Sequence, residues 1–282
     1  MKLISFREGA LESWGVLEDN EIIDLGTIDA GKITELSTIL SEGRLDEVLE
    51  HKTRARRVAL DRVTLGLPLT KPGKILCVGT NYDGHIRETG ATRPDYPVIF
   101  TRFVDSLVAD GAEIIAPRNS VKLDFEGEFV VVIGKTARHV SVEDAEDYIL
   151  GYSILNDGSV RDFQRHTHQF TPGKNFPSSG SFGPVIVTRD EFGPLSAKKI
   201  TTRLNGITVQ EATLDLLIFN ISEILSYISE WTELRPGDII STGTPEGVGA
   251  ARTPELWMFP GDHVEVEIEG IGILANRITE EV

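Results

Sequence analysis

The chain has 282 residues, of which 40% are hydrophobic and 26% are charged, and its formal net charge at pH 7 is −16. This composition is typical of a soluble globular protein with one large domain, or with a small domain and a larger one. The acidic balance excludes nucleic acid as a partner, because phosphate binding requires a basic surface. No apolar run is long enough to span a membrane, and the first residues lack the apolar core of a signal peptide. With one cysteine there is no internal disulfide, so we expect a cytoplasmic protein.

The first quarter of the chain predicts structure rather than chemistry. Residues 1–28 alternate between apolar and polar side chains, which indicates small antiparallel strands. Residues 32–60 carry apolar side chains at helical spacing, and Gly43 is expected to divide them into two helices. A stretch rich in Pro and Gly follows. We therefore predict a small α+β domain at residues 1–70 and a larger domain at residues 71–282.

The second domain begins with a short apolar strand at residues 75–78, followed by a loop that contains Tyr82. His85 and Glu88 then lie three residues apart, so within a helical turn they share a face and can interact. An isolated pair of this kind is usually an ordinary surface pair, and its spacing alone does not decide between that and a catalytic pair. Cys77 lies inside the apolar strand, which is typical of an unreactive core thiol.

Three carboxylates precede the most apolar strand of the sequence. Asp124, Glu126 and Glu128 lead into residues 129–133, a β-branched run that predicts a buried strand. Alternate side chains of a strand share one face, so we expect the three acids to lie on the same side. They repel one another, and burial disfavours their charged forms further. A divalent cation, a pairing with Lys or Arg, or a solvated strand end would each relieve that repulsion.

A second apolar strand, predicted at residues 149–155, leads directly to Asp157. A carboxylate at the end of a core strand is held by a rigid scaffold. The polar segment after it contains Arg161, Gln164 and Lys174, which are groups suited to binding an anion. The alternative is a capped loop with surface charges.

The remaining segments add structure but little chemistry. His166 and His168 are weak evidence for zinc, and we assign them to a loop or a dimer surface. Residues 171–184 predict a loop that covers the site, and the backbone amides after Thr242 are expected to bind a substrate carboxylate. The other predicted elements are a hairpin at 200–213, a core helix at 218–231, a strand at 239–242 and a closing hairpin at 262–279.

Four motifs, in this order, resemble the fumarylacetoacetate hydrolase family over residues 72–282: Glu126-x-Glu128; Asp157 with Ser159-x-Arg161-Asp162-x-Gln164; Gly173-Lys174; and Ser241-Thr242-Gly243-Thr244-Pro245. The resemblance implies an α+β protein whose β-rich second domain forms the family's mixed β-roll, and a homodimer. It also implies that Glu126, Glu128 and Asp157 hold Mg²⁺ or Mn²⁺, with Ca²⁺ as the alternative. Some relatives place a further metal-binding Asp before the histidine. This chain shows no equivalent, so we expect three protein ligands.

The same resemblance implies a metal-dependent hydrolase that cleaves a carbon–carbon bond in a small anionic 2,4-diketo acid, either an acylpyruvate or a diketo-deoxy sugar acid. His85, oriented by Glu88, would activate water, and Lys174 would stabilise negative charge. Substrate binding is assigned to four residues: Tyr82, Arg161, Gln164 and Thr244. The main alternative is an isomerase or decarboxylase of 2-keto acids, such as oxaloacetate or hydroxymuconate-type compounds, at the same site. A non-catalytic, metal-stabilised binding module is a third reading.

Overall fold

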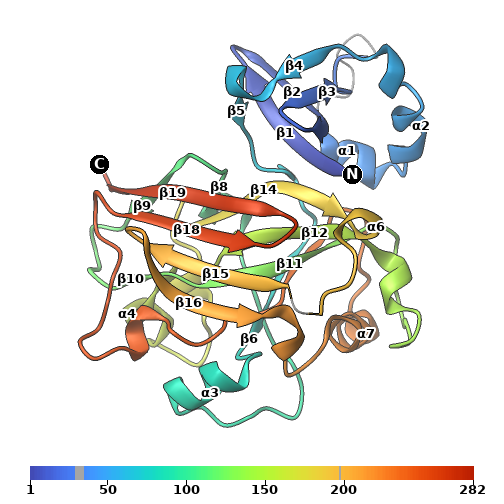
Figure 1. The fold of residues 1–282 in the computed structure, drawn as a ribbon. Helices are drawn as coiled ribbons and strands as arrows, with labels where there is room; N and C mark the ends of the chain where they lie inside the picture. The colour runs from blue at the N-terminus through green and yellow to red at the C-terminus, as the bar shows by residue number, and fades with distance from the viewer. Residues whose placement is uncertain (29–34, 197) are drawn as a thin grey trace.

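Two large β-sheets, a separate two-stranded sheet, seven short α-helices and several 3-10 turns make up the computed structural model, which describes residues 1–28, 35–196 and 198–282 (Figure 1). The larger sheet has the order β4 (Arg57–Ala59), β3 (Glu21–Asp24), β2 (Leu11–Glu18), β1 (Lys2–Glu8), β14 (Gly180–Thr188), β12 (Ile149–Asn156), β11 (Gly127–Ile133), β17 (Ile239–Ser241), β6 (Ile75–Gly79), β7 (Val98–Thr101), with β5 (Thr64–Leu65) beside β1 and β8 (Leu107–Val108) beside β14.

The second sheet covers one face of the first (Figure 1). It has the order β16 (Ile207–Thr213), β15 (Lys199–Leu204), β18 (His263–Ile268), β19 (Gly272–Glu280), β9 (Glu113–Ala116), and a separate pair joins β10 (Leu123–Asp124) to β13 (Ser159–Val160). The helices are α1 (Leu36–Ser41), α2 (Leu45–Leu49), α3 (Asp83–Thr89), α4 (Arg161–Gln164), α5 (Thr171–Lys174), α6 (Arg189–Phe192) and α7 (Ile221–Trp231). The mixed α+β fold predicted from the sequence is confirmed. No helix in the described residues is long and apolar enough to cross a membrane.

Strand β11 is buried on both faces, which explains its unbroken apolar sequence. Phe129, Val131 and Ile133 point into the core between the two sheets. Val130 and Val132 point the other way, into a second core shared with α1 and the first strands. The same alternation carries the acidic residues that precede them toward one side of the sheet.

Phe129 is the side chain on β11 whose truncation we expect to cost most. It is completely buried, and its ring stacks on Tyr152 at 5.0 Å and on Phe192 at 5.6 Å. Phe129→Ala should lower the free energy of unfolding by roughly 3–5 kcal/mol, because it removes buried apolar surface and leaves a cavity. Urea denaturation measures this, with the half-exposed Phe259→Ala as the control; equal midpoints for the two variants would contradict it.

The first 70 residues extend the larger sheet. Strand β1 pairs with β14 at Lys2↔Val187 and Leu3↔Ile186, and β1 to β3 form the predicted antiparallel strands. Two helices, α1 and α2, flank Gly43, whose φ of +66° ends the first of them, as predicted. Residues 57–59, predicted to be helical, instead form the edge strand β4, and Ile33, part of the helical pattern, lies outside the described residues. The domain boundary at residue 70 stays a prediction.

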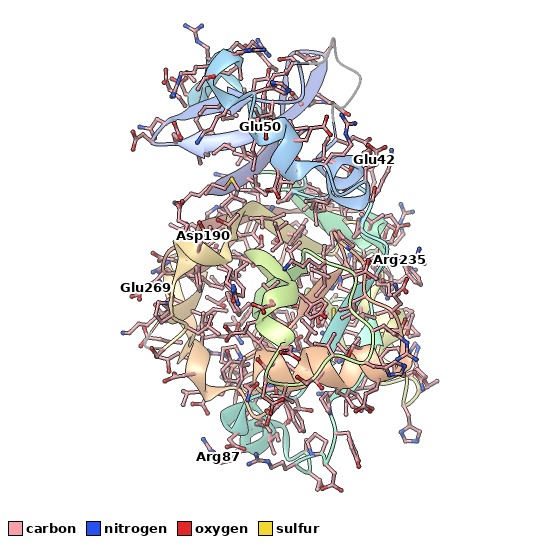
Figure 2. All side chains as sticks on the ribbon, turned by 90° about the vertical axis from the view of Figure 1, so that its right-hand side faces the viewer. Glu42, Glu50, Arg87, Asp190, Arg235 and Glu269 are labelled. Atoms are coloured by element: carbon pink, nitrogen blue, oxygen red, sulfur yellow. The ribbon has the colours of Figure 1, made fainter. Side chains whose placement is uncertain are left out.

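Other differences from the sequence prediction lie near the site. Residues 171–184 are not a loop, since they contain α5 and the start of β14. The core helix begins at Ile221 rather than 218, because Asn220 and Glu223 form a capping box there. Figure 2 shows Glu42 and Glu50 at one end of the molecule and Arg87 of α3 at the other, so the N-terminal segment lies away from the helix that carries His85.

Candidate metal centre

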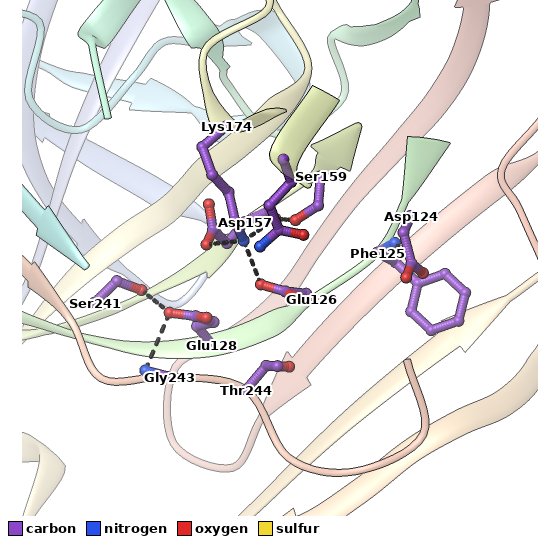
Figure 3. A network of polar contacts seen from close by, with 12 residues as sticks. Asp124, Phe125, Glu126, Glu128, Asp157, Ser159, Lys174, Ser241, Gly243 and Thr244 are labelled. Atoms are coloured by element: carbon purple, nitrogen blue, oxygen red, sulfur yellow. Dashed lines mark hydrogen bonds and ion pairs between the residues drawn. The ribbon is translucent and has the colours of Figure 1, made fainter. Parts of the chain in front are cut away.

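The strand register brings Glu126, Glu128 and Asp157 together. Gly127 pairs with Asn156 across β11 and β12, and the next backbone N–H, that of Asp157, donates to the Glu126 carbonyl at 2.8 Å. Glu128 lies two residues after Glu126 and therefore on the same side. The three carboxylates face one another in Figure 3, each with an oxygen within 4.8 Å of the others, and all three are buried.

Glu128 is the carboxylate held most firmly by neutral groups. Its Oε2 accepts from Ser241 Oγ at 2.5 Å and from the Gly243 N–H at 3.1 Å (Figure 3). Burial raises the pKa of Glu128 well above its usual value, and the charges of Asp157 and Glu126 raise it further. The backbone amides after Thr242 were predicted to bind a substrate carboxylate. The first of them, that of Gly243, donates to Glu128 instead, and for the later amides the expectation stays a prediction.

Lys174 lies between the other two carboxylates. Its Nζ donates to Glu126 Oε2 and to Asp157 Oδ2, each at 2.6 Å. The side chain is almost completely buried, so the alternative of a solvated loop lysine is excluded. Burial lowers the pKa of Lys174, but the charges of Asp157 and Glu126 outweigh it and raise the pKa above its usual value.

Two buried arginines complete the cluster. Arg161 reaches Asp124 with Nε at 2.8 Å and Glu126 Oε1 with Nη2 at 2.7 Å. Burial raises the pKa of Glu126, yet Lys174 and Arg161 beside it hold the pKa below its usual value. Arg102, which sequence reasoning missed, donates from Nη1 to Asp157 Oδ1 at 2.6 Å and to the Gly158 carbonyl at 2.9 Å.

Asp124 does not join the other acids, contrary to the expectation from strand alternation (Figure 3). It lies in the separate strand β10, which ends before β11 begins. Its carboxylate accepts from the backbone N–H groups of Gly249 and Ala250, in addition to Arg161. Asp124 therefore fixes Arg161 and the 249–250 segment.

The donor set fits a hard divalent cation. All three clustered side chains offer carboxylate oxygens, the ligands that Mg²⁺ and Mn²⁺ favour. With Asp124, the buried cluster has four carboxylates, against the three cations Arg102, Arg161 and Lys174. Ionisation of all four is costly in the buried site unless a further cation balances them, which is why the pKa of Glu128 is raised. Glu126, Glu128 and Asp157 are the residues that would hold the ion.

Lys174→Met tests this charge balance. The substitution leaves Glu126 Oε2 and Asp157 Oδ2 without their buried partner, so the metal-free protein should lose roughly 3–5 kcal/mol of stability. Mg²⁺ should recover much of the loss, while turnover stays low because the cation beside the substrate is absent. Thermal unfolding with and without Mg²⁺ measures the effect against Lys135→Met, an exposed lysine. A normal kcat in Lys174→Met would contradict the role of Lys174 in turnover, and an unchanged melting temperature without Mg²⁺ would contradict the charge balance.

A cavity of about 630 Å³ opens onto this cluster. Glu126, Glu128 and Lys174 line its inner part together with His85 and Glu88 of α3. Four further polar or charged side chains line it: Arg161, Gln164, Arg165 and Thr244. A concave site with buried titratable groups is where catalysis is expected.

The predicted contact between His85 and Glu88 is present. His85 Nδ1 lies 2.6 Å from Glu88 Oε1, and Glu88 Oε2 accepts the Gly247 N–H at 2.7 Å. A carboxylate only accepts, so Nδ1 must carry the proton, and in the neutral ring Nε2 is free to accept one. His85 is buried within the cavity wall. The pair is therefore a buried, oriented contact and not an exposed surface pair.

Of the predicted substrate-binding residues, three line the cavity and Tyr82 does not. Gln164 Oε1 accepts from Arg161 Nη1 at 3.0 Å, and both side chains line the cavity. Thr244 lines it too, with a hydroxyl that donates to the Gly127 carbonyl at 3.0 Å. Tyr82 is buried and does not line the cavity, and its hydroxyl has no hydrogen-bond partner in the described residues. Its assignment to substrate stays a prediction.

Cys77 is completely buried in β6, next to the acidic cluster. Burial raises the pKa of its thiol well above the usual value, and Asp157 and Glu128 add to this. A thiol that stays protonated is a poor nucleophile. The prediction of a core cysteine agrees with this environment.

Comparison with known proteins identifies the family. The family model described as fumarylacetoacetate (FAA) hydrolase C-terminal matches residues 74–279. The oxaloacetate tautomerase YisK of Bacillus subtilis (strain 168) is 35% identical over 288 residues, which cover 93% of this chain and 94% of the relative. Two of the similar solved structures align over 100% of this chain and 100% of their own chain. The fumarylacetoacetate hydrolase (EaFAH) from psychrophilic Exiguobacterium antarcticum is 34% identical with a TM-score of 0.88. The maleylpyruvate hydrolase from Sphingobium sp. SYK-6, in complex with manganese(II) ion and pyruvate, is 25% identical with a TM-score of 0.83. The chain is thus an enzyme that belongs to the fumarylacetoacetate hydrolase family.

Proposed function

We propose that this enzyme interconverts the keto and enol forms of a small 2-oxo acid of the oxaloacetate type, at a divalent-metal site formed by Glu126, Glu128 and Asp157. One observation supports this most directly: the oriented base His85 and the buried cation Lys174 line the same cavity as the carboxylate cluster. Enolisation requires a base at C3 and positive charge near the oxygen at C2. The similarity to an oxaloacetate tautomerase favours this chemistry over the hydrolase that the sequence predicted.

The residues of the chain account for the proton transfer. Nε2 of His85 takes a proton from C3, the C–H electron pair becomes the C2=C3 double bond, and the π electrons of the C2=O bond move to the oxygen. That oxygen takes a proton from water, and Nε2 returns its proton to water. The reverse sequence regenerates the ketone. Glu88 holds the ring in the required tautomer and stabilises its charged form. Mg²⁺ or Mn²⁺ at the carboxylates would supply Lewis-acid polarisation of the 2-oxo acid.

Arg161 adds a positive charge, and Gln164 an amide, to the cavity that would hold an anionic substrate. Both line the cavity, and the bond between them aligns the guanidinium and the amide along one wall. Lys174 adds a buried positive charge beside the oxygen on which negative charge develops. The metal-bound, non-catalytic module is a weaker reading, because it leaves the orientation of His85 without a purpose.

Hydrolysis of a 2,4-diketo acid is the second candidate. The same base could activate water for attack on a ketone carbon, and the similar maleylpyruvate hydrolase structure contains manganese and pyruvate. Two assays with Mg²⁺ separate the candidates: decay of enol-oxaloacetate absorbance, and release of pyruvate from acetylpyruvate. Faster enol decay supports the tautomerase. Pyruvate release without accelerated enol decay would establish the hydrolase instead.

The cytoplasmic location, the homodimer and the choice between Mg²⁺ and Mn²⁺ stay predictions. Size-exclusion chromatography with light scattering tests the dimer, and metal analysis of the purified protein tests the ion.

A further inference from the structure

The buried cations of the site are already paired with carboxylates of the protein. Arg102 is bound to Asp157, Arg161 to Asp124 and Glu126, and Lys174 to Glu126 and Asp157. Such charge-assisted pairs use the donors that would otherwise bind a substrate carboxylate. A 2-oxo acid with a second, distant carboxylate therefore needs another cation for that group.

Arg165 is a cation of this kind. It lines the cavity and is exposed, and across residues 1–28, 35–196 and 198–282 no carboxylate lies within ion-pairing distance of its guanidinium. The carboxylates that line the same cavity are committed elsewhere: Glu88 to His85, Glu126 to Lys174, and Glu128 to Ser241. The positive charge of Arg165 is therefore free for a ligand.

The backbone around Arg165 is held in place. Its N–H donates to the carbonyls of Arg161 and Asp162, each at 3.2 Å, which closes the last turn of α4. The adjacent helix α5 packs so closely that a side chain on Gly173 would lie 2.4 Å from the Gln164 backbone nitrogen. Lys174 follows Gly173 directly, so the backbone positions of Arg165 and Lys174 are fixed relative to each other.

We propose that Arg165 determines specificity by binding the distal carboxylate of a dicarboxylic 2-oxo acid, while the 2-oxo acid group occupies the inner part of the cavity beside Lys174. This inference rests on the proposed function for the placement of the 2-oxo acid group. Arg165 would then make the site select dicarboxylates, such as oxaloacetate, over monocarboxylates of equal length. The long, exposed side chain of Arg165 suits a ligand group at the outer part of the cavity.

Binding of two unreactive ligands tests this without turnover. Malate carries the distal carboxylate, whereas 2-hydroxybutanoate has a methyl group in its place. Isothermal titration calorimetry with Mg²⁺ present should show that the wild-type protein binds malate about fivefold more tightly, the upper end of the range for an exposed ion pair. Arg165→Gln should remove this preference and leave 2-hydroxybutanoate affinity within about twofold. Arg165→Lys should retain part of the preference.

Arg62→Gln is the matched control, because Arg62 is exposed and does not line the cavity that contains Arg165. Equal affinity of the wild-type protein for both ligands would overturn the inference, as would an equal loss of both in Arg165→Gln. A malate preference that depends on Arg165, in a protein that does not enolise oxaloacetate, would support the inference and refute the proposed reaction. Turnover of oxaloacetate with kcat/KM unchanged in Arg165→Gln would support the proposed reaction and refute the inference about Arg165.

Discussion

Glu126→Gln is expected to abolish divalent-metal binding and turnover together. Both oxygens of Glu126 are engaged, Oε1 with Arg161 and Oε2 with Lys174, so an amide would place N–H groups against at least one cation. It would also remove one of the three negative charges that face the metal position. A loss of at least about 100-fold in Mn²⁺ affinity is expected, since even changes outside the ligand sphere cost about 10–100-fold.

Metal analysis and Mn²⁺ titration measure this loss. Glu113→Gln is the control, because Glu113 is an exposed glutamate on β9 of the second sheet. Full metal occupancy in Glu126→Gln would show that the ligand set is different from the one proposed.

His85→Ala is expected to keep the metal and lose about 10²–10⁴ in the rate of enolisation, the usual contribution of a general base. Glu88→Ala should lower the rate in the same direction, because the 2.6 Å contact between the two residues fixes the ring. The double variant should be little worse than His85→Ala, since the two act as one unit. Any decarboxylation of oxaloacetate should fall much less, because loss of CO₂ leaves an enolate without a base.

His263→Ala provides the control for this series, since His263 lies in β18 and does not line the cavity. Rates of enol decay, of acetylpyruvate cleavage and of decarboxylation are compared for each variant. Equal losses of all three activities in His85→Ala would mean that the histidine serves substrate binding instead of proton transfer. An unchanged rate of enolisation would remove it from the mechanism.

Local periodicity was sufficient to predict most of the fold. The β-branched run at residues 129–133 and the Asn205-Gly206 turn are local signals that tertiary packing reinforces, and both elements formed as predicted. Residues 57–59 fall at the end of the predicted helical range 32–60, beyond Leu49, the last apolar residue at helical spacing. They form a strand because pairing with β3 at the sheet edge outweighs the weak helical preference there.

Contacts in the site between residues that are far apart in the sequence could not be predicted from local patterns. Glu128 lies in β11 and Glu126 directly precedes it, and the bond from the Asp157 N–H to the Glu126 carbonyl continues the pairing, so alternation placed these two acids together. Arg102 lies 55 residues from Asp157 and comes from an unremarkable segment, and no local pattern signals that contact. Asp124 was misplaced because strand pairing is interrupted between Asp124 and Gly127, and alternation holds only within a continuous strand.

The most direct test of a metal-dependent keto–enol enzyme is the rate of enol-oxaloacetate decay with one preparation of wild-type protein, before chelation, after removal of divalent ions, and after addition of Mg²⁺ or Mn²⁺. The rate should fall to the uncatalysed value on chelation and return on metal addition, and the melting temperature should fall and recover with it, because an ion bound only to the native state stabilises that state. Full catalysis and an unchanged melting temperature in the chelated protein would contradict a metal centre at Glu126, Glu128 and Asp157.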